Sequence, residues 1–158
     1  MHLVAVDEVA AVISALRRSR PADQRLLAYK DGGAWHELDS DDLNGYLKDL
    51  FGREVSAKDF RTWHATVLAA VGLAVSGHAA SPSARKRAVS RAVKEVADYL
   101  GNTPAVCRRS YIDPRLIDRY LDGETVDVRM DRLGADTRPG WPATHGRVET
   151  EIIRLLKG

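Results

Sequence analysis

A long apolar segment near the middle of the chain decides the fold. It reads Ser56-Ala-Lys-Asp-Phe-Arg-Thr-Trp-His-Ala-Thr-Val-Leu-Ala-Ala-Val-Gly-Leu-Ala-Val-Ser-Gly77. Ser56 is a good N-cap, and Asp59 follows at the position of a capping box. Larger side chains recur at helical spacing, as a stripe of Phe60, His64, Val67, Val71 and Val75. The many small residues let neighbouring helices approach closely. The segment therefore predicts the central core helix, which holds Arg61 rigidly near its start.

The sequence on either side predicts further helices and one β-hairpin. The turn Asp31-Gly-Gly33 accepts positive φ and joins two short strands over residues 25–30 and 34–38. Ser40 and Ser83 are expected to cap two of the helices. The predicted helices cover residues 7–20, 41–51, 83–100, 105–109 and 115–121, with a last helix that carries Val148, Ile152 and Leu155 or Leu156 on its inner face. We expect a mainly α fold with this hairpin as its β element.

Length and composition restrict the class of protein. With 158 residues, of which 44% are apolar, the chain can form one domain with a sizeable core. No apolar run approaches the roughly 18 residues of a membrane span, and the start lacks the pattern of a secretion signal. The only cysteine, Cys107, has no partner in the chain for a disulfide. We expect a monomer with no membrane partner, in a reducing, cytoplasmic location.

Charge is distributed unevenly along the chain. Residues 1–50 carry six Lys or Arg against nine Asp or Glu, whereas residues 83–120 carry nine against four. The basic segment predicts a polyanion as partner, and a solvated charged helix face remains the alternative.

A second stretch, Leu100-Gly-Asn-Thr-Pro-Ala-Val-Cys-Arg-Arg-Ser-Tyr-Ile-Asp-Pro114, places Tyr111 between helical pieces and close to arginines. A phenol is mostly protonated at neutral pH, so it is a poor nucleophile unless donors and cations stabilise the developing charge. Arginine can contact two phosphate oxygens at once, and the amide of Asn102 can donate a further hydrogen bond. From spacing alone, Tyr111 is either a surface aromatic residue or a nucleophile that attacks a phosphodiester.

Two motifs decide between these interpretations. Lys58-Asp-Phe-Arg61-Thr-Trp is followed about forty residues later by Gly101-Asn-Thr-Pro104 and then by Tyr111. Over roughly residues 8–123, the chain resembles the C-terminal part of the catalytic domain of bacterial, poxvirus-like type IB DNA topoisomerases. The resemblance implies that Arg61 is the core arginine of the catalytic set, Tyr111 its nucleophile and Asn102 its second phosphate donor.

The resemblance also implies a fold, a reaction and partners. The fold is the helical catalytic domain shared by tyrosine recombinases and type IB topoisomerases, with residues 124–158 as an extension made of a loop and a terminal helix. The reaction cleaves and rejoins one strand of duplex DNA through a 3′-phosphotyrosyl intermediate, with no metal, cofactor or nucleotide. The implied location is cytoplasmic and associated with the nucleoid. The candidate DNA-binding residues are Lys58, Arg85, Lys86, Arg108 and Arg109.

One departure from the family pattern affects the expected activity. The family uses a further arginine and a lysine, the lysine as general acid, and both lie upstream of the part that aligns with this chain. We therefore expect a fragment whose relaxation activity is strongly impaired. Two alternatives stay open: a catalytic fragment of a tyrosine recombinase or integrase, and a DNA-binding module without catalysis.

Overall fold

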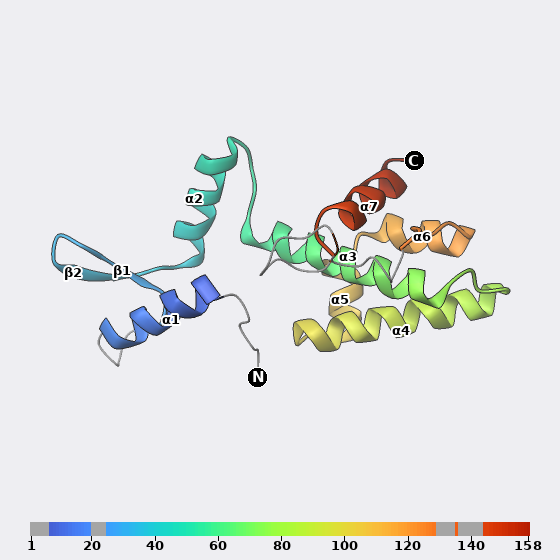
Figure 1. Ribbon diagram of the computed structural model, residues 1–158, viewed down its shortest axis with the longest axis horizontal. Coiled ribbons are helices and arrows are strands. Elements are labelled where there is room, and N and C mark those ends of the chain that lie inside the picture. Colours follow the sequence, from blue (N-terminus) through green and yellow to red (C-terminus); the bar gives the residue numbers. More distant parts are fainter. Residues whose placement is uncertain (1–6, 20–24, 129–134, 136–143) are drawn as a thin grey trace. The chain divides into compact units, whose positions relative to one another are not determined.

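The computed structural model of the chain describes residues 7–19, 25–128, 135 and 144–158. Over these residues the protein is mainly helical, with one antiparallel two-stranded sheet, so the predicted fold class is confirmed. Much of the loop expected after residue 123, namely 129–134 and 136–143, lies outside the described residues. The elements follow in the order α1 (Asp7–Ser19), β1 (Ala28–Asp31), β2 (Ala34–Glu37), α2 (Ser40–Phe51), α3 (Ala57–Ser76), α4 (Pro82–Leu100), α5 (Pro104–Ser110), α6 (Pro114–Asp122) and α7 (Arg147–Lys157) (Figure 1).

The described residues form two compact units. The first ends at Ala57 and contains α1, the hairpin and α2, and the second begins at Lys58 and contains α3 to α7. The domain division predicted at residue 123 stays a prediction, although α7 belongs to the same compact unit as α3.

The hairpin of the first unit is confirmed, with Tyr29 opposite His36 in its register. Its turn residues Gly32 and Gly33 have φ of 54° and 87°, the left-handed region that a two-residue hairpin turn requires. Within the described part of this unit, Ala28 alone is buried.

The predicted cap of α2 is wrong by one residue. Asp39 caps the helix instead of Ser40: its side chain accepts hydrogen bonds from the backbone N–H groups of Asp41 and Asp42, at 2.8 and 2.9 Å. The side chain of Asp42 accepts in return from the backbone N–H of Asp39. This reciprocal capping box satisfies more donors than a serine could, so Ser40 becomes the first helical residue.

The core of the second unit forms around α3, as predicted, but on a different face. Val67 is buried, whereas Phe60 and Val75 of the predicted stripe are 50% and 62% exposed. The buried face of α3 consists mainly of small residues, namely Ala65, Thr66, Val67, Ala69, Ala70 and Leu73. A Cβ placed on Gly72 would lie 3.6 Å from the Cβ of Ala92 on α4, so close approach of helices, and not side-chain size, selects this face.

The cap of α4 also differs from the prediction. Ser81, not Ser83, caps the helix, because the Ser81 hydroxyl accepts from the backbone N–H of Ala84 at 3.2 Å. Pro82 then occupies the first helical position, where its missing N–H is harmless. Ser83 therefore lies inside the helix.

The last helix, α7, completes the core of the second unit. Its inner residues Ile152 and Leu156 are buried, and Val148 and Leu155 pack against the same core, as the sequence predicts. The described helices include none that is long and apolar enough to cross a membrane.

Candidate active site

Arg61 lies in the second turn of α3 and connects three elements. Its Nη2 donates a hydrogen bond to the carbonyl oxygen of Leu100 at 2.7 Å. Leu100 is the last residue of α4, where carbonyl groups lack partners within the helix and the helix dipole is negative. The guanidinium also lies over the ring of Tyr111, with 5.1 Å from Cζ to the ring centroid. A single arginine thus joins α3, the end of α4 and the predicted nucleophile.

Asn102 reaches the same acceptor. Gly101 ends α4 in the left-handed conformation, and the backbone N–H of Asn102 then donates to Ala97 at 2.9 Å. The side-chain amide of Asn102 lies 3.4 Å from the Leu100 carbonyl oxygen, to which it donates. The structure therefore brings the two predicted phosphate donors to one oxygen atom, beside the ring of Tyr111.

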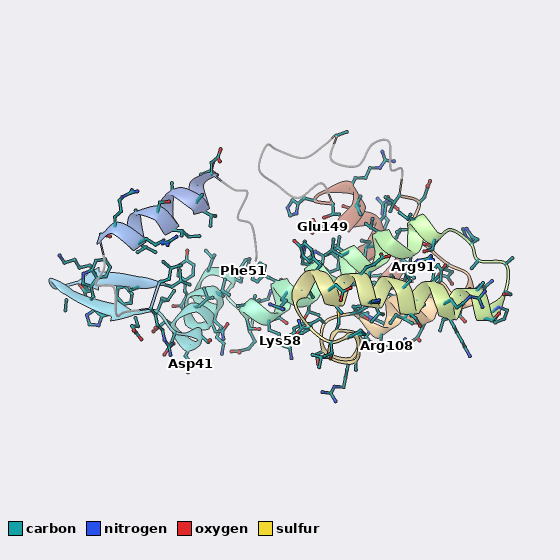
Figure 2. All side chains as sticks on the ribbon, turned by 90° about the horizontal axis from the view of Figure 1, so that it is seen from below. Asp41, Phe51, Lys58, Arg91, Arg108 and Glu149 are labelled. Carbon is teal, nitrogen blue, oxygen red and sulfur yellow. The ribbon has the colours of Figure 1, made fainter. Side chains whose placement is uncertain are left out.

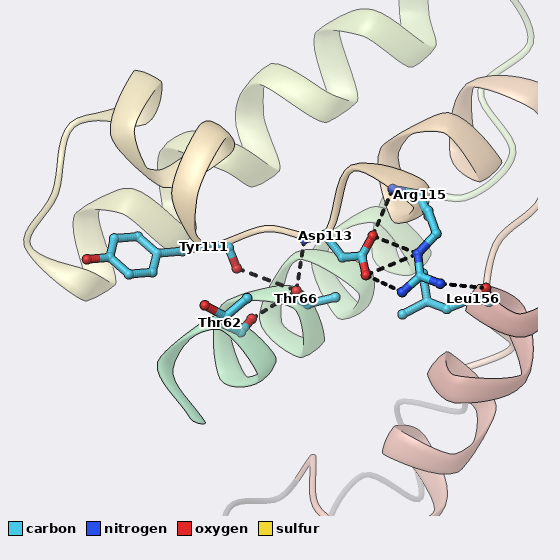
Figure 3. Close-up of polar contacts among 6 residues, drawn as sticks. All are labelled: Thr62, Thr66, Tyr111, Asp113, Arg115 and Leu156. Atoms are coloured by element: carbon cyan, nitrogen blue, oxygen red, sulfur yellow. Dashed lines mark hydrogen bonds and ion pairs between the residues drawn. The ribbon is translucent and has the colours of Figure 1, made fainter. Parts of the chain in front are cut away.

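Tyr111 follows directly after the short helix α5, which Thr103 caps. Its backbone N–H donates to Cys107 at 3.0 Å, and its side chain is half-buried. Among the described residues the phenol oxygen has no hydrogen-bond partner, which leaves it available to a ligand. Figure 3 shows the ring directed away from Thr66.

Thr66 supports the segment of Tyr111, and nothing in the sequence motifs pointed to it. It is 1% exposed, and its hydroxyl accepts from the backbone N–H of Asp113 at 3.0 Å while donating to Thr62 at 2.9 Å (Figure 3). The carbonyl oxygen of Tyr111 lies 3.5 Å from the same hydroxyl. Thr66 thus ties the chain on both sides of Ile112 to α3. A hydroxyl inside an otherwise apolar helical run is the signal that could have identified it.

Asp113 starts the next helix and is held by Arg115. Its carboxylate caps α6 by accepting from the backbone N–H of Arg115 at 3.0 Å. The Arg115 guanidinium forms an ion pair with it at 2.7 Å, and these hydrogen bonds hold the pKa of Asp113 below its ordinary value. The same arginine lies 3.5 Å from the Leu156 carbonyl oxygen, so this corner is linked to α7.

Cys107 lies beneath the site. It is fully buried, as expected for a small apolar residue, and burial raises the pKa of its thiol. The positive charge of Arg61 acts in the opposite direction but is the smaller influence. A protonated, buried thiol is inert, so Cys107 supplies packing and not chemistry.

The candidate DNA-binding residues do not all have free side chains. Lys58, Lys86, Arg108 and Arg109 are exposed. Figure 2 labels Lys58 and Arg108. Arg85 is half-buried and donates to the carbonyl oxygens of Leu121 at 2.6 Å and Ala79 at 3.3 Å. Its guanidinium therefore stabilises the end of α6. The part of the chain that the structure describes holds no group of three or more His, Cys, Asp or Glu able to bind a metal ion.

Comparison with known proteins identifies the family to which the chain belongs. The model of the family described as eukaryotic DNA topoisomerase I, catalytic core, matches residues 7–122. Because the match covers most of the chain, the chain belongs to the topoisomerase I family, whose enzymes are isomerases of the type IB class acting on DNA. No curated protein matches the chain significantly in sequence. Helix α7 lies outside the matched residues.

Proposed function

We propose that this chain is the C-terminal part of a poxvirus-like type IB topoisomerase catalytic domain, with Tyr111 as the nucleophile. The observation that carries the proposal is the convergence of Arg61 and Asn102 on the Leu100 carbonyl oxygen beside the Tyr111 ring. Two donors that share one oxygen atom are also placed to share a phosphate oxygen.

In the proposed reaction, the Tyr111 oxygen attacks a DNA phosphodiester. A bond forms between that oxygen and phosphorus, and the bond from phosphorus to the 5′ oxygen breaks. The phenol loses its proton, and the leaving oxygen takes up a proton to become a 5′ hydroxyl. Arg61 and Asn102 stabilise the charge on the non-bridging oxygens. The hydroxyl attacks back after the duplex has rotated, so the energy of the bond is kept in the intermediate and no cofactor is needed.

We also propose that this chain by itself has weak DNA relaxation activity. In the family, the general acid for the leaving 5′ oxygen is a lysine upstream of the aligned part. Such proton transfer contributes typically about 10²- to 10⁴-fold to a rate. Relaxation of supercoiled plasmid by the 158-residue chain is therefore expected to be slow or absent. The nucleoid-associated location and the monomeric state also remain predictions.

The test replaces the leaving oxygen with sulfur. A thiolate departs without being protonated, so a duplex with a bridging 5′ sulfur at the scissile phosphate removes the need for a general acid. The wild-type chain should form a covalent adduct with this duplex, visible as a shifted band on a denaturing gel.

Tyr111→Phe should abolish the adduct. The matched control is Tyr99→Phe, because Tyr99 is 60% exposed in the same unit and should be dispensable. An adduct that survives Tyr111→Phe, or a wild-type chain that forms none on the sulfur-containing duplex, would show that the proposal is wrong.

A further inference from the structure

The first two turns of α3 carry Arg61 and contribute no fully buried side chain to the hydrophobic core, although the partly buried Trp63 packs against it. All residues from 57 to 64 are described, and none of them is buried. Burial begins only at Ala65, which is fully buried. A helix end with little buried surface opens more easily than the core, so polar contacts add to the packing of Trp63 in fixing the position of Arg61.

Side-chain hydrogen bonds of Arg61 and Trp63 join this part of α3 to α4 and α7. On one side, Arg61 donates to the Leu100 carbonyl oxygen. On the other, Nε1 of Trp63 donates to Oε1 of Glu149 in the first turn of α7, at 2.8 Å. Residues two positions apart lie roughly 200° apart around a helix. The two contacts therefore hold the turn from nearly opposite sides.

The carboxylate of Glu149 is itself fixed. Its Oε2 accepts from the backbone N–H of Gly146, the residue just before α7, at 3.2 Å. Nδ1 of His145 lies 3.1 Å from the same oxygen. The helix that bears Glu149 is anchored by Ile152, which is fully buried. The indole of Trp63 therefore binds a rigid, charged acceptor and not a mobile side chain.

We propose that Glu149 and Trp63 are positioning residues for Arg61, which makes α7 a working part of the catalytic site. Glu149 fixes the indole, the indole fixes the first turns of α3, and these turns present the guanidinium to a DNA phosphate. This inference rests on the proposed function only in taking Arg61 as a phosphate ligand. It gives a role to α7, which the family match over residues 7–122 does not include.

The test is a double-mutant cycle on DNA binding by the full 158-residue chain. Trp63→Phe keeps the apolar ring and the net charge but removes the N–H donor. Binding is measured with a short fluorescein-labelled duplex at fixed salt. Arg61→Ala should weaken binding about tenfold, as expected for a lost charge-assisted hydrogen bond to phosphate. Trp63→Phe should weaken it about threefold, and should have no further effect in the Arg61→Ala background.

Equal effects of Trp63→Phe in both backgrounds, or no effect in either, would overturn the positioning role. Trp35→Phe in β2 is the matched control and should leave binding unchanged. Glu149→Ala should loosen the helix end as Trp63→Phe does. Glu149→Gln keeps an oxygen acceptor for the indole. In this variant the helix end should therefore stay more ordered than in Glu149→Ala.

Amide hydrogen exchange separates this inference from the proposed function. Exchange over residues 58–64 should be faster in Trp63→Phe and in Glu149→Ala, with residues from Ala65 onward unchanged. Unchanged exchange over residues 58–64 overturns the positioning role whatever the adduct assay gives. A different pair of results is faster exchange in the two variants together with no adduct from the wild-type chain. That pair would support the positioning contact and overturn only the proposed function.

Discussion

Replacing Thr66 with valine isolates the hydroxyl that ties the segment after Tyr111 to α3. Valine has nearly the same volume, so the core stays filled, but it cannot accept the hydrogen bond from the backbone N–H of Asp113. A buried donor left without a partner costs about 1 to 3 kcal/mol. We expect Thr66→Val to lower the free energy of unfolding by that amount.

Urea unfolding followed by far-ultraviolet circular dichroism measures this loss. The matched control is Thr66→Ser, which keeps the hydroxyl and loses only a methyl group, at a cost of about 1 kcal/mol. Hydrogen exchange adds a local measurement, because the amide of Asp113 should lose protection in the valine variant and keep it in the serine variant. A valine variant as stable as the wild type, with a protected Asp113 amide, would refute the reasoning.

The same pair of variants tests whether Thr66 matters to the reaction. The hydroxyl holds Asp113, two residues after Tyr111, so its loss should let the proposed nucleophile, Tyr111, move away from Arg61. Adduct formation on the sulfur-containing duplex should therefore be slower for Thr66→Val than for Thr66→Ser. Equal rates for the two would limit Thr66 to stability.

Two further outcomes are expected. Asp113→Asn should lower the Tm at neutral pH, because the lowered pKa of Asp113 means that its carboxylate stabilises the fold. That stabilisation is present above the ordinary carboxyl pKa and is lost as pH falls through the folded-state value, so the two melting curves should converge in acid. Ile152→Ala in α7 should cost about 2 to 5 kcal/mol by urea unfolding, since Ile152 is fully buried; a cost near zero would mean that α7 is a loosely attached extension.

Local chemistry made the secondary structure predictable, and burial was harder to predict. The hairpin followed from Gly32 and Gly33, because a two-residue turn needs positive φ at both positions. Caps were misplaced where a neighbouring residue had the better geometry, as with Asp39 and Ser81. The buried face of α3 was partly missed, because periodicity weights large side chains such as Phe60 while the helix packs on its alanines.

The motifs indicated which residues to consider at the site but not how they are held. Arg61, Asn102 and Tyr111 could be named because their types and spacing resemble a known set, and the structure brings them together. The shared Leu100 carbonyl oxygen could not be foreseen, since any residue supplies a backbone acceptor. The contact between Trp63 and Glu149 spans most of the distance from the motif to the C-terminus, and no local pattern encodes it.

The close approach of α3 and α4 at Gly72 limits how this sequence can vary. A methyl group on Gly72 would lie in ordinary contact with Ala92, so this contact has room for alanine and little for a larger side chain. At this position the size of a side chain matters more than its polarity, because a large side chain would push the two helices apart. At the far end of the same pair, the Arg61 guanidinium would then lose its reach to Leu100. A residue far from the site, with no functional group, thus sets the spacing on which the proposed chemistry depends.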